Sequence, residues 1–447
     1  MAFQTAGYVD FSIESLIFLS QVTLLYSKYI ILIIVFYMFK KSILLTAIPE
    51  LSLGIFLVFS SSIGQTFFIS LFSGEIRNEF NLSHGMFGIF YSTATLVSAM
   101  VFFWLGKITD KFNLTPLGLI TLVAISGCSF LISSAESLLI LFLSLLGLRL
   151  FGQSMLSHIA VTSIARWFSK KRGKALSIAL LGHPIGEALL PSIVTFFLLQ
   201  QTWREIWMGI GLCIIIIFLP LIYFLSRYLK PKRQLLIDNS VEAKNIQKIS
   251  WDRSQVIKDI RFYQIMPGLL SSPFIVTGVF FHQIHLIETK SWSISMFASC
   301  YPLFALSVTV ITFGTGWIVD RFSTIHILPF FLLPLAFALF LIAYTDNTYA
   351  APIFMLLMGA TTGAATIIIS SLWAELYGIK HIGSIRSMCF AIVVISTSVS
   401  PALIGLLLDV GVTLEVQFIT LAIYIILCSI SLAILTPNLL ITRPPKL

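Results

Sequence analysis

Apolar residues in this chain are gathered into long runs, separated by short polar segments. Twelve runs are long enough to cross a membrane, since a spanning helix needs about 20 predominantly apolar residues. They lie near residues 48–73, 85–105, 115–135, 138–164, 175–199, 206–228, 262–287, 294–318, 325–345, 350–373, 383–408 and 414–435. A transmembrane β-barrel would show short alternating segments instead. The pattern therefore predicts an all-α membrane protein.

The composition supports this prediction. Hydrophobic residues make up 57% of the 447 residues, charged residues make up 11%, and the mean hydropathy is +0.98. A soluble domain averages about 25% charged residues. We therefore expect a multi-pass protein surrounded by the lipid bilayer.

The net charge of +9 is explained by membrane orientation. With both ends of a twelve-helix core in the cytoplasm, 23 of the 28 Lys and Arg residues fall on the cytoplasmic side. Arg77, Arg204 and Lys290 fall outside, and Lys28 and Arg149 lie within apolar runs. This is the positive-inside pattern, so the basic charge does not indicate a nucleic-acid partner.

One long polar stretch divides the chain into two groups of six runs. Residues 229–261 are predicted to be a cytoplasmic linker with short amphipathic helices. It joins an N-terminal six-helix bundle at 44–228 to a C-terminal one at 262–436, and 437–447 form a cytoplasmic tail.

Residues 1–43 are an N-terminal extension. Its apolar run at 15–39 is interrupted by Lys28, and no cleavage site follows, so a signal peptide is not expected. The extension is either an extra helix with its N-terminus outside, which we favour, or an interfacial segment. A chain starting at Met38 would lack it.

The two halves carry matching residues at a constant offset of 210 positions. The pairs are Gly106 and Gly316, Asp110 and Asp320, Lys111 and Arg321, Phe112 and Phe322, Gly173 and Gly383, Ser177 and Ser387, and Pro191 and Pro401. Two parallel six-helix repeats are one of the architectures of membrane transporters. The repeat therefore predicts that architecture.

Several segments resemble the major facilitator superfamily. "GKITDKF" (106–112) and "GWIVDRF" (316–322) resemble its loop signature between the second and third helix of each half. "ARWFSKKRGKALSIALLGHPIGEALLP" (165–191) is similar to its bacterial monocarboxylate-porter-like and oxalate/formate-antiporter-like members. So are "SIGQTFFISLFSGEIRNEFNLS" (62–83) and "VTGVFFHQIHLIETKSW" (276–292). The resemblance implies a twelve-helix fold of two six-helix bundles that transports a small solute, and a location in the bacterial inner (plasma) membrane.

The two signature loops are candidate gating segments. Gly106 and Gly316 would permit close backbone approach at a helix end, and Asp110 and Asp320 would cap the following helix. The resemblance adds that the first aspartate holds the bundles together on the cytoplasmic side, next to the basic residue Lys111 or Arg321. Asn113 and Ser323 stand where the family often has a second glycine.

An arginine in the fourth apolar run is the strongest candidate for function. At about 1.5 Å per residue, Arg149 lies roughly 16 Å below the outer end of its helix, and Glu187 lies at a similar depth on the next helix. Gln153 and His183 share their respective helix faces. An ionisable group inside a membrane marks a pathway by default, so we expect Arg149 and Gln153 to bind substrate and Glu187 or His183 to carry a coupled proton. The alternative is a closed Arg149–Glu187 bridge that only fixes two helices.

Three further residues are candidate substrate contacts. Gln65 lies in the middle of the first run, and His282 and His285 lie at the outer end of the seventh run. For the two histidines, a position at the membrane interface without contact to substrate is the alternative.

These residues favour a secondary active transporter of a small organic solute, most simply an anionic carboxylate, because guanidinium binds carboxylate bidentately. Symport with protons is expected, with a monomer as the working unit. Efflux of amphipathic compounds through a Phe-rich cavity and a non-transporting sensor on the same fold are the alternatives.

An enzyme is not expected. The chain offers only His282 and His285 as a close histidine pair, whereas a di-iron centre needs clustered histidines, and it has no nucleophile-elbow or zinc-protease motif. The five cysteines are scattered and show no metal-ligand or disulfide spacing. We therefore expect no cofactor and no bound metal.

Overall fold

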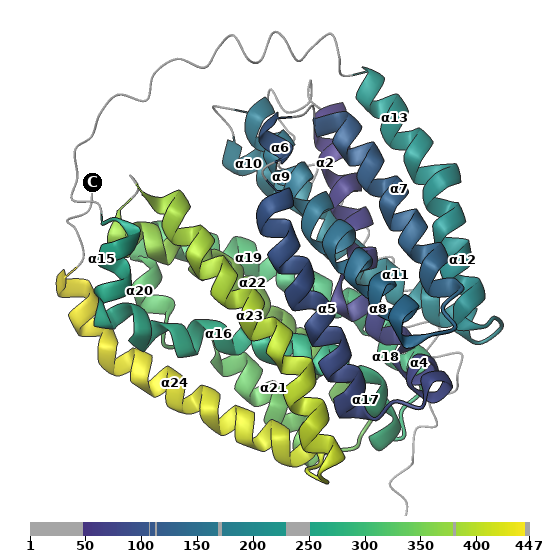
Figure 1. Ribbon diagram of the computed structural model, residues 1–447. Coiled ribbons are helices and arrows are strands. Elements are labelled where there is room, and N and C mark those ends of the chain that lie inside the picture. The colour runs from purple at the N-terminus through teal and green to yellow at the C-terminus, as the bar shows by residue number, and fades with distance from the viewer. Residues whose placement is uncertain are drawn as a thin grey trace, which may run out of the picture. The chain divides into compact units, whose positions relative to one another are not determined.

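The computed structural model describes residues 48–106, 108–111, 114–168, 172–228, 251–378 and 381–442. Ala47–Leu447 belong to one compact unit, and every regular element in its described part is a helix (Figure 1). The predicted all-α class is confirmed. The expected N-terminal extension at 1–43 and most of the expected linker lie outside the described residues.

The described elements of the N-terminal half run from Ile48 to Tyr228. Two of them, η4 and η5, are π-helical, and η2 and η3 are short 3-10 turns. The elements are α2 (Ile48–Ser61), η2 (Ser62–Gly64), α3 (Thr66–Ile69), η3 (Ser70–Phe72), α4 (Ser73–Phe80), α5 (His84–Leu105), α6 (Ile108–Lys111), α7 (Leu114–Ser133), α8 (Leu138–Gly147), η4 (Leu148–Leu156), α9 (Ser157–Trp167), α10 (Arg172–Leu180), α11 (Gly182–Leu198), α12 (Trp203–Cys213), η5 (Ile214–Phe218) and α13 (Leu219–Tyr228).

The described elements of the C-terminal half begin at Arg253, inside the predicted linker, and all of them are α-helices. They are α15 (Arg253–Lys258), α16 (Ile260–Phe281), α17 (Gln283–Thr289), α18 (Ile294–Ser299), α19 (Tyr301–Phe322), α20 (Thr324–Ile327), α21 (Leu333–Tyr344), α22 (Ala350–Tyr377), α23 (Ile382–Asp409) and α24 (Leu414–Thr442). The short helix α15 begins with a capping box, in which Asp252 accepts a hydrogen bond from the backbone of Gln255.

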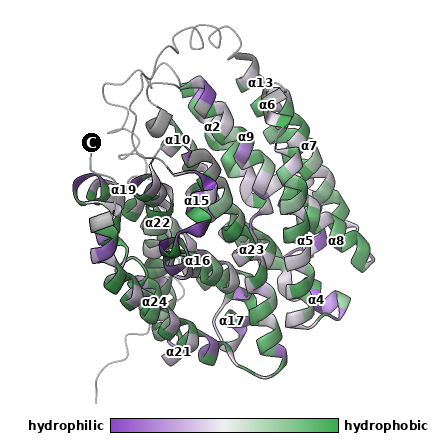
Figure 2. Cartoon of the chain, turned by 60° about the vertical axis from the view of Figure 1, so that its left-hand side comes forward, coloured by the Kyte–Doolittle hydropathy of each residue, from purple (hydrophilic) through white to green (hydrophobic). Residues whose placement is uncertain are grey.

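The helices coincide with the predicted apolar runs. Within the described residues, ten helices are long and apolar enough to cross a membrane, and the bent pair Ile48–Gly64 and Thr66–Phe80 adds an eleventh if it is one span. The ninth predicted run forms the shorter apolar helix Leu333–Tyr344. Figure 2 shows hydrophobic residues along most of the long helices and hydrophilic residues on the short elements α4 and α17.

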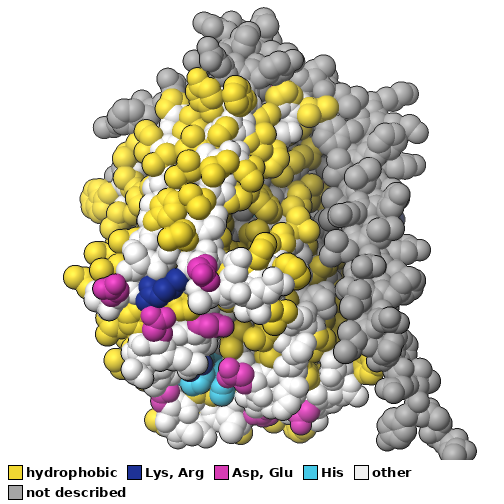
Figure 3. All heavy atoms as spheres, turned by 90° about the vertical axis from the view of Figure 1, so that its right-hand side faces the viewer, with side chains coloured by type: hydrophobic (Ala, Val, Ile, Leu, Met, Phe, Trp, Pro, Cys, Tyr) yellow, Lys and Arg dark blue, Asp and Glu magenta, His cyan; other side chains and the backbone are white. Residues whose placement is uncertain are grey.

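The outer surface of the helices is apolar, as a lipid environment requires. Side chains such as Ile216, Phe224 and Ile434 are at least two-thirds exposed. On the face shown in Figure 3, hydrophobic side chains cover a broad area, and charged and histidine side chains gather below it. We therefore describe the chain as a multi-pass integral membrane protein.

The two halves of the unit pack together at one end, the end that the charge distribution predicts to face outside. Here α5 packs along α23, and α4 packs against α17. At Gly88 an added Cβ would collide with the backbone of Pro401, and at Gly405 it would collide with the backbone of His84. Glycine is required at both positions because the two helix backbones touch. We call this contact of α4 and α5 with α17 and α23 the external seal.

Candidate functional site

The first membrane helix is broken at Gln65. The 3-10 turn η2 ends at Gly64, Gln65 is extended (φ −82°, ψ 154°) and α3 begins at Thr66. The two parts of the span are bent by 49°. Ser60 and Ser61 precede the break and hydrogen-bond to carbonyl groups of their own helix, which competes with regular helix formation. Discontinuous helices in transporters carry substrate and ion sites, so the break marks a candidate site.

The guanidinium of Arg149 is bound at this break. Its Nη1 donates to the carbonyl of Gly64 at 3.0 Å and to Oγ1 of Thr66 at 3.3 Å, and its Nε donates to Oγ1 of Thr95 at 3.1 Å. The guanidinium carbon lies 5.2 Å from the ring centroid of Tyr91, within the range of a cation–π contact. Arg149 is 1% exposed. These neutral groups offset the cost of a positive charge inside the membrane.

The helix that carries Arg149 is itself irregular. The arginine lies in the π-helix η4, and π-helical turns occur frequently at functional sites. Gly152 in the same turn packs against the backbone of Gly64, with no room for a Cβ at either position. Gln153 and Gln65 are neighbours of this contact and are half-buried.

The alternative of a closed Arg149–Glu187 bridge is not found in the described structure. No ion pair of Arg149 occurs within the described residues, and its hydrogen bonds go to helices α5, η2 and α3 instead. Equal depth on neighbouring helices was therefore not sufficient to bring the two side chains together. The sequence analysis did not predict Thr66, Tyr91 and Thr95 as partners of Arg149. It compared the depths of ionisable and amide side chains and did not consider hydroxyl groups.

Glu187 and His183 lie on α11, where it meets the C-terminal half. Glu187 is half-buried, and the neighbouring Gly186 packs against Ser62. His183 contacts Oγ of Ser157 through Nε2 at 3.4 Å. Helix α11 packs along α19, so Glu187 lies on a helix between the two halves, and within the described residues it forms no ion pair with Arg149.

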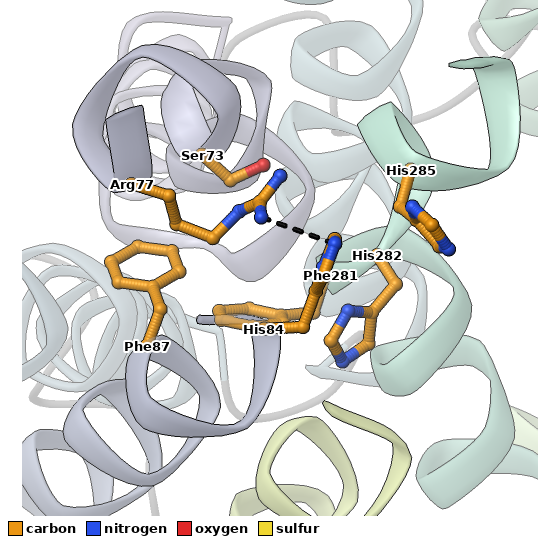
Figure 4. Close-up of a pocket in the computed structure, with 7 residues that line it drawn as sticks. All are labelled: Ser73, Arg77, His84, Phe87, Phe281, His282 and His285. Carbon is orange, nitrogen blue, oxygen red and sulfur yellow. Dashed lines mark hydrogen bonds between the residues drawn. The ribbon is translucent and has the colours of Figure 1, made fainter. Parts of the chain in front are cut away.

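His282 and His285 lie in the external seal and not beside Arg149. With Ser73, Arg77, His84, Phe87 and Phe281 they line a cavity of about 10 Å³ (Figure 4), enough for about one water molecule. His84 faces both residues, with its ring centroid 4.3 Å from that of His285 and 6.1 Å from that of His282. Within the described residues these rings belong to no group that could hold a metal ion.

Aromatic contacts connect the two regions. Tyr91, which lies under Arg149, packs on Phe281 at 4.7 Å between centroids, and Phe281 packs on His282 at 5.0 Å. A second buried network crosses the halves beside it. Gln283 donates to the carbonyl of Phe67 at 3.0 Å and to Ser70 at 2.8 Å, and it accepts a hydrogen bond from Tyr301. The sequence reasoning did not find this network.

The second signature loop differs from the expectation. Gly316 lies inside α19, where an added Cβ would meet nothing within 4 Å, so it permits no close approach. Asp320 also lies inside α19, and Ser323 caps the next helix instead. Ser323 has φ of 107°, a conformation that favours glycine. The carboxylate of Glu375 holds this turn by accepting hydrogen bonds from Ser323 Oγ and, at 3.0 Å, from the backbone of Thr324.

The first loop is described only in part. Gly106 is the C-cap of α5, as expected for a helix end, with φ of −56°. Asp110 and Lys111 lie in the short helix α6, and their side chains are outside the described part. Arg321 lies over the rings of Trp317 and Phe322. The gating role of these residues stays a prediction.

Two helical halves, a broken first helix and a buried cation at the break define a membrane transporter architecture. The Pro191 and Pro401 pair of the sequence repeat lies inside α11 and α23, at corresponding places of the two halves. The sequence profile described as Major Facilitator Superfamily matches residues 54–401. The chain belongs to this superfamily of membrane transporters.

Solved structures of the same fold are available for comparison. Two crystal structures of a bacterial homolog to the human lysosomal transporter Spinster, one inward-facing and occupied and one inward-facing and unoccupied, have TM-scores of 0.66 and 0.65. They are 14% and 13% identical to this chain, and each match covers 91% of this chain and 100% of that chain. A search of curated protein sequences finds no match. The structural likeness supports the fold alone.

Proposed function

We propose that this protein is a proton-coupled symporter that moves a small organic anion, most simply a monocarboxylate, by alternating access. It would work as a monomer in the bacterial inner membrane. The observation that carries the proposal is the Arg149 guanidinium, whose hydrogen bonds all go to neutral groups. A substrate carboxylate would supply the missing negative charge and bind the planar guanidinium through two oxygens.

The helix break gives the anion a way to reach Arg149. The Nη1 contacts of Arg149 go to Gly64 and Thr66, which flank the extended residue Gln65. A change of backbone conformation at Gln65 would remove these contacts and free the guanidinium for substrate. Gln65 and Gln153 are close enough to the break to add amide contacts. The guanidinium of Arg149 would therefore lose its hydrogen bond to the backbone carbonyl of Gly64 and form one to a carboxylate oxygen of the substrate.

Glu187 is the candidate proton carrier. It is half-buried at the boundary of the halves, and within the described residues it forms no ion pair. Because Arg149 does not contact it, coupling would not run through a direct ion pair. Instead, proton and substrate would each favour the same conformation of the two halves, which is sufficient for positive coupling.

A second function has its own support. Within the described residues Glu187 has no cation partner, and it lies near the buried Tyr301, whose ring stacks on Phe280. Such a carboxylate would also suit an amphipathic cation. Efflux of such compounds would use Glu187 as the substrate contact and would not need Arg149 to be accessible. Anion symport therefore requires Arg149 for substrate binding, whereas efflux of cations would require Glu187 for it.

Transport assays with purified protein in proteoliposomes distinguish the two functions. We expect uptake and counterflow of small carboxylates, a large loss with Arg149→Lys because lysine lacks the planar fork, and no transport with Arg149→Ala. Glu187→Gln should retain counterflow and lose proton-driven accumulation. Arg204→Lys is the matched control, since Arg204 already has Glu79 as its ion-pair partner.

The opposite result has a clear form. Near-normal carboxylate transport by Arg149→Ala would leave the arginine as a structural clamp of the helix break and would overturn the proposal. Transport of organic cations that depends on Glu187 and not on Arg149 would establish the efflux function instead.

A further inference from the structure

The histidine cluster of the external seal has a feature that transport of an anion does not explain. Arg77 in α4 and His84 in α5 are joined by a hydrogen bond of 3.1 Å between Nη1 and Nε2 (Figure 4). An arginine side chain has only donors. In this structure Nε2 of His84 must therefore be the acceptor, and His84 must be neutral.

His84 is also part of the contact between the halves. Its backbone carbonyl lies against Gly405 of α23. The residues on either side of it bind one carboxylate of α23, because Ser83 Oγ and the backbone of Gly85 donate to Asp409 at 2.6 and 3.0 Å. A change at His84 therefore acts directly on the helices that close the external end.

The charged and titratable groups around His84 and its neighbour His285 lie on five elements. The cationic and titratable neighbours are Arg77 on α4, His282 at the end of α16 and His285 on α17, and the acidic ones are Asp409 on α23, Glu288 on α17 and Glu415 on α24. Glu415 is already paired with Lys290 at 3.2 Å, and Asp409 is held by the two donors described above. A proton on His84 would consequently face Arg77 and His285 at short distance.

His285, which follows the membrane-spanning part of α16, supports this picture. Burial lowers its pKa, and the charge of Arg77 lowers it further, whereas Glu288 and Glu415 act in the opposite direction. The net shift favours a neutral ring. The closed seal thus favours uncharged imidazoles on both sides of the contact.

We propose that His84 is a proton-binding site that controls the external seal, which closes only when His84 is neutral. A protonated His84 cannot accept the hydrogen bond from Arg77 and places a second cation 3.1 Å from it. Because the open seal would expose His84 to water, protonation occurs more readily in that state. Acid on the external side therefore favours the outward-open conformation, by up to about tenfold per pH unit for one proton.

This inference does not depend on the substrate, and it differs from proton coupling at Glu187. A proton bound at His84 has to return to the outside before the seal can close, so it is not carried across the membrane. It regulates how often the transporter faces outward.

The test measures the separation of the external ends directly. Spin labels would be placed at Asn78→Cys and Thr348→Cys, two exposed positions on the N- and C-terminal halves, in a chain whose five cysteines are replaced by alanine. Distance distributions from electron double resonance would be recorded in proteoliposomes at about pH 8 and about pH 5.5, which brackets histidine titration. We expect the long-distance population to increase at the lower pH.

Two variants and one control test whether protonation of His84 causes the change in distance. His84→Gln keeps an acceptor for Arg77 but cannot be protonated, so its distances should not respond to pH. Arg77→Gln keeps a donor but removes the repelling charge, so the response should be weaker. His326→Gln, at an exposed histidine of α20 on the predicted cytoplasmic side, should respond as the parent does.

The proposal is overturned if the parent distances do not change with pH, or if His84→Gln responds fully. If the external seal of His84→Gln is open at both pH values because the packing of this side chain is lost, the response of Arg77→Gln to pH tests the proposal instead. A reduced response of Arg77→Gln supports the proposal, and a full response overturns it.

Discussion

The close contact of α5 and α23 leads to a steric prediction about the transport cycle. A Cβ atom at Gly405 would lie 2.5 Å from the carbonyl oxygen of His84, 2.8 Å from its carbonyl carbon and 3.0 Å from Cα of Gly85. All three atoms belong to the backbone, so the methyl group of Gly405→Ala can be accommodated only if the helices move apart. We therefore expect this substitution to disfavour the closed external seal.

The size of the effect follows from the cost of overpacking. Inserting one carbon into a packed contact costs typically about 1–3 kcal/mol, which corresponds to a shift of roughly 5- to 150-fold in the ratio of open to closed molecules. Transport should fall, because each cycle requires the closed state, whereas the amount of folded protein should change little. The substitution carries no charge, so the shift should be the same at all pH values.

Chemical labelling measures this shift. Ser73 lines the seal cavity and is 4% exposed, so a cysteine at this position should react with an external impermeant maleimide only when the seal opens. Gly405→Ala should raise the labelling rate in right-side-out vesicles. Gly209→Ala is the matched control, because a Cβ at Gly209 meets nothing within 4 Å. Equal labelling rates in Gly405→Ala and Gly209→Ala would refute the steric reasoning.

Two further predictions concern stability on the predicted cytoplasmic side. Glu375→Ala removes the acceptor of Ser323 and Thr324. At about 1.5–3 kcal/mol per hydrogen bond to a charged group, this change should lower the melting temperature by several degrees, and Glu375→Gln should have an intermediate effect. Unchanged melting temperatures of both variants would show that the turn needs no carboxylate. Burial would raise the pKa of Asp259, but hydrogen bonds from Arg261 and Tyr377 outweigh this effect and lower it. The stability that Asp259 contributes is therefore present above its ordinary pKa of 3.8 and is lost as the pH falls through the lower folded value. The melting difference between wild type and Asp259→Asn should accordingly be constant from about pH 8 to about pH 5 and should shrink only below about pH 4, whereas a difference that already disappears at pH 5 would contradict this assignment.

The fold could be predicted from the sequence because the length of an apolar run depends only on residues that are neighbours in the sequence. Each apolar run of sufficient length forms a helix wherever it packs, and the positions of Pro191 and Pro401 inside corresponding helices follow from the 210-residue repeat. The break at Gln65 was not predicted, because Ser60, Ser61 and Gly64 weaken a helix without determining where it bends.

The site was harder to predict because depth along a helix does not determine its rotation. Arg149 and Glu187 have similar predicted depths but face different neighbours, and Arg149 lies in the π-helical turn η4, which differs in rotation per residue from a regular helix. The positive φ of Ser323 depends on a carboxylate 52 residues away. His84 was not ranked, because the histidines that it contacts in the C-terminal half are more than 190 positions away in the sequence.

The bond from Arg149 to the Gly64 carbonyl has an evolutionary consequence. A backbone carbonyl without a partner inside a membrane is costly, and here a side chain replaces the amide that a continuous helix would supply. The kink and the arginine therefore depend on each other, and neither should be inherited alone. Among related chains, those with an apolar residue in place of Arg149 should have a straight first helix, and those that keep the kink should keep a long donor side chain at this position.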